Sequence, residues 1–245
     1  MQASANGRLL VVDVGGIAGW VQPGEGLRKV AVAPCNGPGR AAPDGSKLLC
    51  AGGPATTVIQ PSVWRAHELD VSPEQASFLG PDANEILFAD AQGIAAADAR
   101  HPNELRRLAP HAPTSHLMPS PDGKRAVGRY QNEDGAFTLN VFLLDGKAAK
   151  RRLGQDSLPI TWAPDSQWLL VQSDKLACIA RAVGGEYKCW RGYTALAFSP
   201  DSAHVLLARN GSLYTAPIDG VEPVRPTRVV EKTTGAATWI PSAQD

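Results

Sequence analysis

The sequence predicts an all-β fold, a six-bladed β-propeller built from four-stranded antiparallel blades, and three observations support this prediction. A Pro-Asp motif recurs with its aspartates at positions 44, 82, 122, 165 and 201, and Pro241-Ser242 is a degenerate last copy. The intervals are 38, 40, 43, 36 and 41 residues, and a strand-rich repeat of about 40 residues is typical of one propeller blade. Dividing the 245 residues by this repeat gives six blades.

The motif has the chemistry of a tight turn between two strands. Pro121 presets φ for the second position of a type I turn, Asp122 can bond back to its own backbone, and Gly123 accepts the left-handed conformation. Three other copies carry Ala83, Ser166 and Ser202 in place of this glycine. Because a side chain in the left-handed region costs roughly 1 kcal/mol, we expect those three turns to adopt another geometry.

Short apolar runs predict the strands that follow each turn. The runs are mostly four to eight residues long and are separated by many of the 24 Gly and 20 Pro residues, which favours strands over helices. In each repeat, strand A ends at the turn, and strands B, C and D follow outward. The predicted strands are 39–42, 47–51, 56–60 and 63–69; 76–79, 85–89, 93–97 and 105–108; 115–118, 125–130, 137–144 and 148–153; 159–162, 168–172, 176–181 and 187–191; and 194–198, 205–208, 213–218 and 225–230. The one helix-compatible stretch, 95–108, is interrupted by Pro102.

The two ends of the chain each carry part of a sixth blade. Strands are predicted at 8–14, 19–22 and 27–33 with no strand A before them, and 236–240 reads as a strand A with only a tail after it. We therefore predict a single propeller domain over residues 1–245, with blade six split between 8–33 and 235–240. Closing a ring in this way would hide strand edges that otherwise promote aggregation.

The turns resemble those of a known repeat family. The segments Phe198-Ser-Pro-Asp-Ser202, Trp162-Ala-Pro-Asp-Ser166 and Ser120-Pro-Asp-Gly-Lys124 are similar to TolB-like propeller repeats, also called WD-like repeats of the Pro-Asp type. The resemblance covers about residues 35–242 and implies the propeller fold. It also suggests a place in a bacterial envelope complex, as for periplasmic TolB. Because the family includes propellers fused to peptidases and secreted proteins of unknown role, the resemblance does not carry one function with it.

The four cysteines fall in two hairpin-like pairs. Cys178 and Cys189 flank a Gly-Gly pair, and Cys35 and Cys50 lie on either side of the first Pro-Asp-Gly turn. Directly opposed strand positions are close enough for a disulfide. We predict the disulfides 35–50 and 178–189, and hence a periplasmic or extracellular location. The alternative is four buried, reduced thiols.

Charge and hydrophobicity argue against two classes of partner. The formal net charge is zero, so bulk electrostatics favour neither nucleic acid nor an anionic membrane. No apolar run approaches the roughly 18 residues of a membrane helix, and we expect a protein that is not embedded in a membrane. The basic run 147–152 falls on an outer strand, where charge commonly prevents edge pairing.

No catalytic or metal-binding motif is recognisable. Residues 14–19 are glycine-rich but lack the order of a dinucleotide-binding loop, and they read as a turn. His101, His111 and His116 lie near one another in sequence, but their spacing matches no metal-ligand motif. We therefore predict no catalytic residue, no metal and no cofactor.

The tryptophans suggest packing rather than chemistry. Trp162 and Trp239 occupy equivalent positions just before their turns, which predicts packing between blades. Trp20, Trp64 and Trp190 fall on outer strands, where they would belong either to the core or to the rim.

The propeller topology indicates where a binding site would lie. The loops between strands D and A and those between strands B and C meet on one face, around the mouth of the central channel. The candidate binding residues on these loops are His111, Asn132, Glu133, Asp134, Ser157, Asp174, Arg191, Tyr193, Arg209 and Asn210. They are polar, varied and tied to no reaction, which favours recognition of another protein.

The sequence favours a non-enzymatic, exported interaction or scaffold module that binds another protein, whose identity the residues do not reveal. One alternative is a propeller enzyme of the lactonase or sugar-dehydrogenase type, with a metal or cofactor held in the channel. The predicted strand A residues offer few ligands for it: Ala41, Phe78, Leu117, Ile160, Leu196 and Thr238. The other alternative is a carbohydrate-binding propeller, but the outer tryptophans are not at repeat-equivalent positions.

Overall fold

The structure is a computed structural model of the chain. It describes residues 2–3, 9–12, 18–21, 28–30, 40–42, 47–51, 56–60, 65–69, 76–80, 82–110, 113, 115–145, 150–219 and 224–230. In this part of the chain, no helix has the length and hydrophobicity of a membrane span.

Strands in the described residues pair into six four-stranded antiparallel sheets, and within each sheet the strands pair in sequence order. The sheets consist of β1 (Gln2–Ala3), β2 (Leu9–Val12), β3 (Ala18–Val21) and β4 (Arg28–Val30); β5 (Arg40–Ala41), β6 (Leu48–Ala51), β7 (Thr56–Gln60) and β8 (Arg65–Leu69); β9 (Ala76–Leu79), β10 (Glu85–Asp90), β11 (Gly93–Asp98) and β12 (His101–Ala109); β13 (Ser115–Pro119), β14 (Arg125–Gln131), β15 (Phe137–Leu143) and β16 (Lys150–Gln155); β17 (Leu158–Trp162), β18 (Trp168–Ser173), β19 (Leu176–Arg181) and β20 (Tyr187–Arg191); and β21 (Thr194–Phe198), β22 (His204–Arg209), β23 (Ser212–Pro217) and β24 (Thr227–Val230).

The all-β prediction and the four-stranded repeat are confirmed. The largest difference in a boundary is at β12, which begins at His101 rather than at 105. Pro102 lies within this strand, although its position in the sequence suggests only the interruption of a helix-compatible stretch. An outermost strand tolerates proline because one of its edges has no partner strand to receive an N–H.

The first sheet takes its first strand from the start of the chain. Strand β1 pairs with β2 through Gln2 opposite Leu10 and Ala3 opposite Leu9. This is the edge that we expected residues 236–240 to occupy. Those residues lie outside the described part of the chain, so the split sixth blade and the closure of the ring remain predictions.

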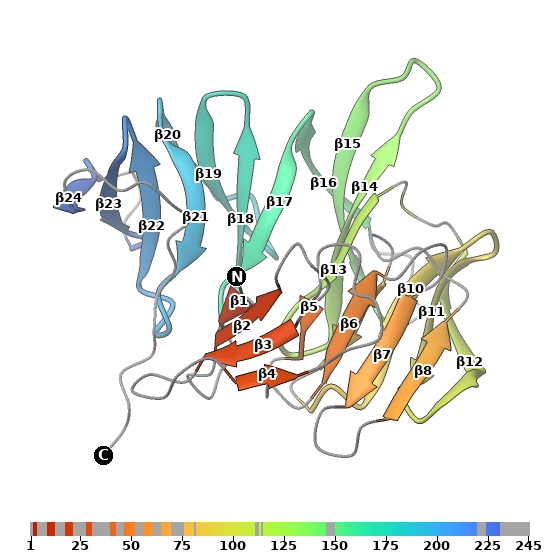
Figure 1. Cartoon of the computed structure of the whole chain (residues 1–245). Coiled ribbons are helices and arrows are strands. Elements are labelled where there is room, and N and C mark those ends of the chain that lie inside the picture. Colours follow the sequence, from red (N-terminus) through yellow and green to blue (C-terminus); the bar gives the residue numbers. More distant parts are fainter. Residues whose placement is uncertain are drawn as a thin grey trace.

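Consecutive sheets pack face to face in sequence order, from the orange sheet β5–β8 to the blue sheet β21–β24 (Figure 1). Four apolar clusters form the core, and each is shared by two neighbouring sheets. In β10, Ile86 and Phe88 pack towards β5–β8, whereas Leu87 and Ala89 pack towards β13–β16. Side chains alternate between the two faces of a strand, so a strand buried on both faces needs a continuous apolar run.

The expectation that the three glycine-free turns would use another geometry was wrong. Ala83, Ser166 and Ser202 have φ of 48°, 62° and 60°, in the same left-handed region as Gly123 at 68°. For the two serines the structure supplies a reason. The backbone N–H of Asp122 donates to Ser166 Oγ, and that of Asp165 donates to Ser202 Oγ, both at 3.0 Å.

Each of these bonds joins the turn of one sheet to the turn of the next. Ser166 and Ser202 are buried, with 1% and 7% of their surface exposed, so the bonded N–H groups would have little access to water. The hydroxyl therefore offsets the cost of the left-handed backbone. Ala83 adopts the same conformation without a side-chain oxygen, and nothing in the structure explains why.

Two further predictions are confirmed where the residues are described. The Trp162 indole donates to the Met118 carbonyl of the preceding sheet at 3.1 Å, which is the expected contact between blades; Trp239 lies outside the described residues. Cys178 and Cys189 face each other in β19 and β20 with a Cα–Cα distance of 4.1 Å, and they form a disulfide. Cys35 is not described, so the 35–50 pairing stays a prediction.

The hydrogen bond between neighbouring turns gives a stability prediction. We expect Ser202→Ala to lower the free energy of unfolding by about 1 kcal/mol, because it removes the acceptor for Asp165 N–H and leaves the backbone strain in place. Urea unfolding measures this change. Ser212→Ala, at a half-buried serine of β23 whose hydroxyl makes no hydrogen bond in the described part of the chain, is the control. Equal effects of the two substitutions would contradict the role given to Ser202.

Candidate functional site

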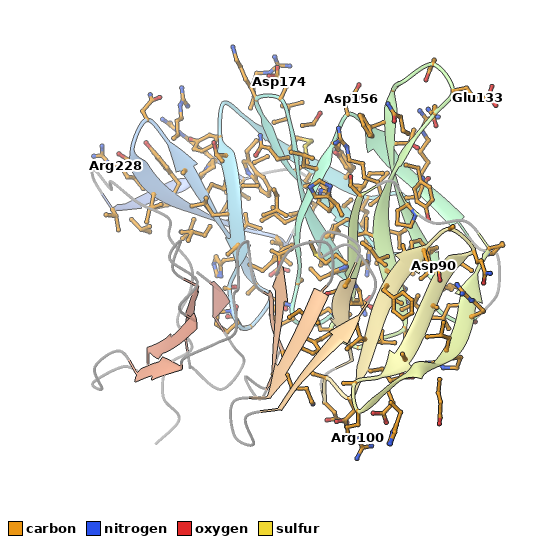
Figure 2. All side chains as sticks on the ribbon, turned by 45° about the vertical axis from the view of Figure 1, so that its right-hand side comes forward. Asp90, Arg100, Glu133, Asp156, Asp174 and Arg228 are labelled. Atoms are coloured by element: carbon orange, nitrogen blue, oxygen red, sulfur yellow. A yellow bond between two sulfur atoms is a disulfide. The ribbon has the colours of Figure 1, made fainter. Side chains whose placement is uncertain are left out.

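The loop face consists of the β10–β11, β14–β15, β18–β19 and β22–β23 turns together with the β16–β17 and β20–β21 connections. Figure 2 shows Asp174, Asp156 and Glu133 from three of these segments at one end of the sheets, and Arg100 from the β11–β12 turn at the other end. Glu133 and Asp174 are two of the candidate residues, and a binding role for the candidates stays a prediction. His111 is not described.

The β14–β15 hairpin carries Asn132, Glu133 and Asp134, and it reaches beyond the other turns of this face (Figure 1). All three residues are exposed. Asn132 N–H donates to the Ala136 carbonyl at 2.8 Å, and Ala136 N–H donates to Asp134 Oδ1 at 3.0 Å. The hairpin is thus held by its own hydrogen bonds and presents the Glu133 side chain to solvent.

Asp174 and Asn210 owe their positions partly to the turns themselves. They begin the β18–β19 and β22–β23 turns with φ of 42° and 51°. Aspartate and asparagine tolerate this left-handed conformation better than other residues with side chains. Their polarity therefore follows from the backbone geometry and is not by itself a sign of binding.

Ser157 is only 3% exposed, so its hydroxyl does not lie on the surface of the loop face. The neighbouring Asp156 has a φ of 50°, and its backbone N–H donates to the Phe137 carbonyl at 3.0 Å. Phe137 N–H in turn lies 3.4 Å from Asp156 Oδ1. These contacts hold the β16–β17 connection against the start of β15. Asp156 therefore has a structural role in the loop face.

Two other predicted residues come together in a cluster of cationic and aromatic side chains. The Tyr193 and Tyr214 rings meet edge to face, with centroids 5.2 Å apart and an interplanar angle of 82°. The Arg209 guanidinium lies over the Tyr193 ring, 5.3 Å from its centroid. Both tyrosines are half-buried against the core between β17–β20 and β21–β24, whereas Arg209 is exposed. We call these three residues the Arg209 cluster.

Gln172, at the end of β18, holds the backbone beneath the Arg209 cluster. Its Oε1 accepts Ala195 N–H at 2.8 Å, and its Nε2 donates to the Asp174 carbonyl at 2.9 Å and approaches the Tyr193 carbonyl at 3.5 Å. One carboxamide thus joins the β18–β19 turn to the β20–β21 connection. Gly192 N–H adds a further link, donating to the Lys175 carbonyl at 2.6 Å.

A second stacked guanidinium lies two sheets away from Arg209, beyond the sheet β17–β20. Arg129, in β14, has its guanidinium carbon 3.6 Å from the centroid of the Phe137 ring. Its Nε is buried and has no hydrogen-bond partner in the described part of the chain. Arg129 occupies the position in its sheet that Gln172 occupies in the next, because both lie seven residues after the turn aspartate.

The carboxylate of Asp90, at the end of β10, is already paired. It accepts from Arg107 Nη1 at 2.7 Å and from Gln92 N–H at 2.8 Å. The hydrogen bond from Arg107 is the main cause that lowers the Asp90 pKa, and burial opposes it. This carboxylate therefore serves the β10–β11 turn rather than presenting an open ligand.

The described residues do not contain a group of three or more His, Cys, Asp or Glu side chains that could hold a metal. His116 lies in β13 with a φ of 59°, and its Nδ1 is 2.8 Å from Ser115 Oγ. His101 begins β12 beside the Arg100 turn, at the opposite end of the sheets from the loop face. The sequence proximity of the two histidines therefore does not bring them to one site.

The shifted pKa values in the described residues do not point to acid–base chemistry. The pKa of Asp98 falls to about 2, chiefly through its hydrogen bond with Arg100. Burial raises the pKa of Tyr130 to about 12. The Ser199 hydroxyl lowers the pKa of Asp201 by donating directly to its carboxylate, so it is not paired with an imidazole as an activated nucleophile would be. A general acid or base works best with a pKa near the operating pH.

Sequence reasoning missed three residues of this face: Gln172, Tyr214 and Arg129. Each lies inside a predicted strand and was therefore counted as part of the scaffold. A polar or amphipathic residue at the loop end of an otherwise apolar strand is the sequence feature that could have identified them. Which partners these side chains reach depends on how neighbouring sheets face one another.

Comparisons with known proteins identify the fold. No family model matches the chain, and no curated protein matches it significantly. Among solved structures, the β-propeller domain of Cps50 (Swd1) from Myceliophteria thermophila is 14% identical with a TM-score of 0.71, covering 98% of this chain and 90% of that one. A putative TolB from Agrobacterium tumefaciens is 15% identical with a TM-score of 0.57, covering 88% and 90%. A chain of Kuenenia stuttgartiensis hydrazine synthase is 15% identical with a TM-score of 0.64, covering 89% and 75%. At these identities the similarity shows the fold alone, and that fold is a β-propeller.

Gln172 gives a prediction for the rigidity of the loop face. We expect Gln172→Met, which keeps the side-chain length, to lower the free energy of unfolding by about 1–2 kcal/mol, because Ala195 N–H loses its acceptor. Amide hydrogen exchange at Ala195 should also become faster. Gln167→Met, at an exposed position next to the turn, is the control and should change neither quantity. Unchanged exchange at Ala195 in the Gln172 variant would contradict the bracing role.

The pair of Asp90 and Arg107 predicts a dependence of stability on pH. The folded pKa of Asp90 is lowered, so its contribution is complete above the unfolded value of about 3.9 and is lost as the pH falls through the folded value. We expect Arg107→Gln to lose less stability than wild type between pH 5 and pH 2.5, measured by urea unfolding. Asp90→Asn removes the titrating group and should show the same reduced loss. Identical acid profiles in all three proteins would contradict the assignment.

Proposed function

We propose that the chain is a non-enzymatic β-propeller that binds another protein through its loop face. The observation that carries the proposal is the Arg209 cluster. Its exposed guanidinium lies over the half-buried Tyr193 ring, Tyr193 packs edge to face against Tyr214, and Gln172 braces the backbone beneath them. Arginine and aromatic side chains are enriched at the centres of protein interfaces and among the residues that dominate binding energy. A rigid backbone reduces the entropy that binding must otherwise remove.

The inner strands favour this function over a channel enzyme. Phe78 and Leu117 are buried, and Ile160 and Leu196 are half-buried; none of these side chains offers a metal ligand or a proton. Some of the structurally similar chains belong to enzymes, namely hydrazine synthase and the dihydro-heme d1 dehydrogenase NirN, but at 15% and 12% identity only the fold is shared. Ala41 has no described side chain, and Thr238 lies outside the described residues.

A carbohydrate-binding propeller is less well supported. Such a site needs an exposed aromatic face, but Trp190 is 4% exposed and its indole donates to the Val224 carbonyl at 2.9 Å. Trp190 therefore belongs to the core. The side chain of Trp20 and the whole of Trp64 lie outside the described part of the chain.

We further propose that the whole chain, 1–245, forms one six-bladed ring. Strands β5, β9, β13, β17 and β21 each contact the next in turn, and β1 contacts β5. This is the order that a propeller requires around its channel. In a closed ring, residues 235–240 would pair with the first sheet.

An oxidising compartment and a place in an envelope complex complete the proposal. The Cys178–Cys189 disulfide supports a periplasmic or extracellular location, because such bonds persist mainly in exported proteins. Structural similarity to a putative TolB is in keeping with an envelope role. The partner is expected to be another protein rather than nucleic acid, since the net charge is zero.

Site-specific photo-crosslinking tests the binding face. A benzoylphenylalanine placed at Asn132 or Asp174, both exposed on the loop face, should capture the same protein from an envelope extract of the source cells, identified by mass spectrometry. The same group at Arg100, on the opposite end, is the control and should not capture it. Capture from position 100 alone, or equally from all three positions, would contradict the proposed face.

A further inference from the structure

Eight arginines of the described chain can be compared by whether they pair with a carboxylate. Five of them form ion pairs with carboxylates: Arg100, Arg106, Arg107, Arg125 and Arg181. Arg129, Arg191 and Arg209 come from strands that run to the loop face, and in the described part of the chain none of them has a carboxylate partner. The strands that run to the loop face thus carry three guanidinium groups without a carboxylate. They are not the full set, because Arg152 and Arg225 also form no ion pair in the described part of the chain.

Arg209 is held in a position suited to receive an anion. Its guanidinium lies over the Tyr193 ring, and it makes no hydrogen bond with the described residues. Stacking on an aromatic ring occupies the flat face of a guanidinium and leaves the N–H groups at its edge available for a bidentate bond to a carboxylate. Gly192, beside Arg209, has a φ of 80°. A methyl group added there would reach only ordinary van der Waals contact with the guanidinium carbon, at 4.0 Å, so the backbone conformation rather than space beside Arg209 accounts for this glycine.

Arg129 repeats the arrangement on the other side of the sheet β17–β20. Arg129 shares a strand face with Val127, which packs against β17–β20. Arg209 shares a strand face with Leu207, which packs against the opposite face of the same sheet. Two stacked guanidiniums, over Phe137 and over Tyr193, thus lie on either side of β17–β20.

The acidic residues of the loop face do not neutralise this arrangement. Asp134 and Asp156 already accept backbone N–H groups, from Ala136 and Phe137. Asp174 is exposed and forms no ion pair in the described part of the chain. Its negative charge disfavours a densely acidic ligand, so the site suits a single carboxylate within an otherwise uncharged segment.

We propose that the loop face recognises its protein partner through a carboxylate, which Arg209 binds edge-on while Tyr193 holds the guanidinium in place. This inference rests on the proposed function and specifies the chemistry of the partner. A glutamate or aspartate side chain and a free carboxyl terminus share that chemistry, and the test separates them.

The test uses the full chain labelled with ¹⁵N and three synthetic peptides of about eight residues. The first contains one glutamate and has blocked ends, the second replaces that glutamate with glutamine, and the third has glutamine and a free carboxyl terminus. We expect the Arg209 Nε–H signal to shift with the first or the third peptide and not with the second. The peptide that binds identifies the source of the carboxylate, and the shift should weaken as salt is raised.

Matched variants assign the effect to one side chain. We expect Arg209→Gln to weaken binding of the carboxylate peptide about tenfold, because a charge-assisted bidentate bond is lost. Arg209→Lys keeps the charge but loses the planar, bidentate donor geometry of the guanidinium. Its affinity for the peptide should therefore lie between those of Arg209→Gln and wild type. Arg100→Gln makes the same charge change at the opposite end and should bind as wild type. Because Arg209 is exposed, each variant should keep the wild-type pattern of amide signals away from the loop face.

Three results would overturn the inference: equal binding of the glutamate and glutamine peptides, no binding of either carboxylate peptide, or equal weakening by Arg209→Gln and Arg100→Gln. Failure here can be told apart from failure of the proposed function. If the crosslinks from Asn132 and Asp174 form but the carboxylate peptides do not bind, the face is correct and the carboxylate inference is wrong. If the crosslinks also fail, the binding face itself is wrong.

Discussion

The structure depends on burying both faces of each sheet against its neighbours. The four core clusters all lie between consecutive sheets, so the apolar area of a strand such as β10 is divided between two interfaces. A sheet in this position needs apolar side chains at successive positions, because odd and even residues face different neighbours. Burial also explains why few reactive side chains lie in the described interior. The positions between sheets are occupied mainly by Leu, Ile, Val and Ala, whose packing supplies most of the stability.

Directional bonds at the turns fix how neighbouring sheets meet. Hydrophobic packing alone allows sheets to slide, but the bonds from Asp122 N–H to Ser166 Oγ and from Asp165 N–H to Ser202 Oγ define one alignment. The Trp162 indole adds a third such bond near the same end, to the Met118 carbonyl. A left-handed serine is thus explained by the neighbouring blade rather than by its own turn. The recurring motif closes a hairpin and also joins that hairpin to the one before it.

The hydrogen bonds that align neighbouring sheets lie at the turn end. The residues of the loop face, at the opposite end, are not needed for this alignment and can therefore differ between sheets. The loop face carries hairpins of different lengths, stacked arginines and a bracing glutamine, and these features differ from one sheet to the next. At the equivalent position Arg129 stands in one blade and Gln172 in the next, and they serve different ends: one stacks on Phe137 and the other supports the backbone beneath Tyr193. Binding specificity is proposed to arise from this variation on a repeated frame, as loops on a rigid scaffold commonly provide it.

The repeat, the strand pattern, the turn positions and the Cys178–Cys189 pair could all be predicted from the amino-acid sequence, because each depends on residues close together in the chain or on a period that can be counted. The sequence also predicted Tyr193 and Arg209 on one face, since the alternation of loops follows from the strand order. It did not show that Ser166 and Ser202 keep the left-handed turn, because the compensating N–H comes from a residue about 40 positions away. Three further features became clear only from the folded structure: Ser157 is buried, Tyr214 supports Tyr193, and Gln172 reaches Ala195. These contacts cross between strands and between sheets, and their distances are set by how the sheets pack, which no local pattern of residues encodes.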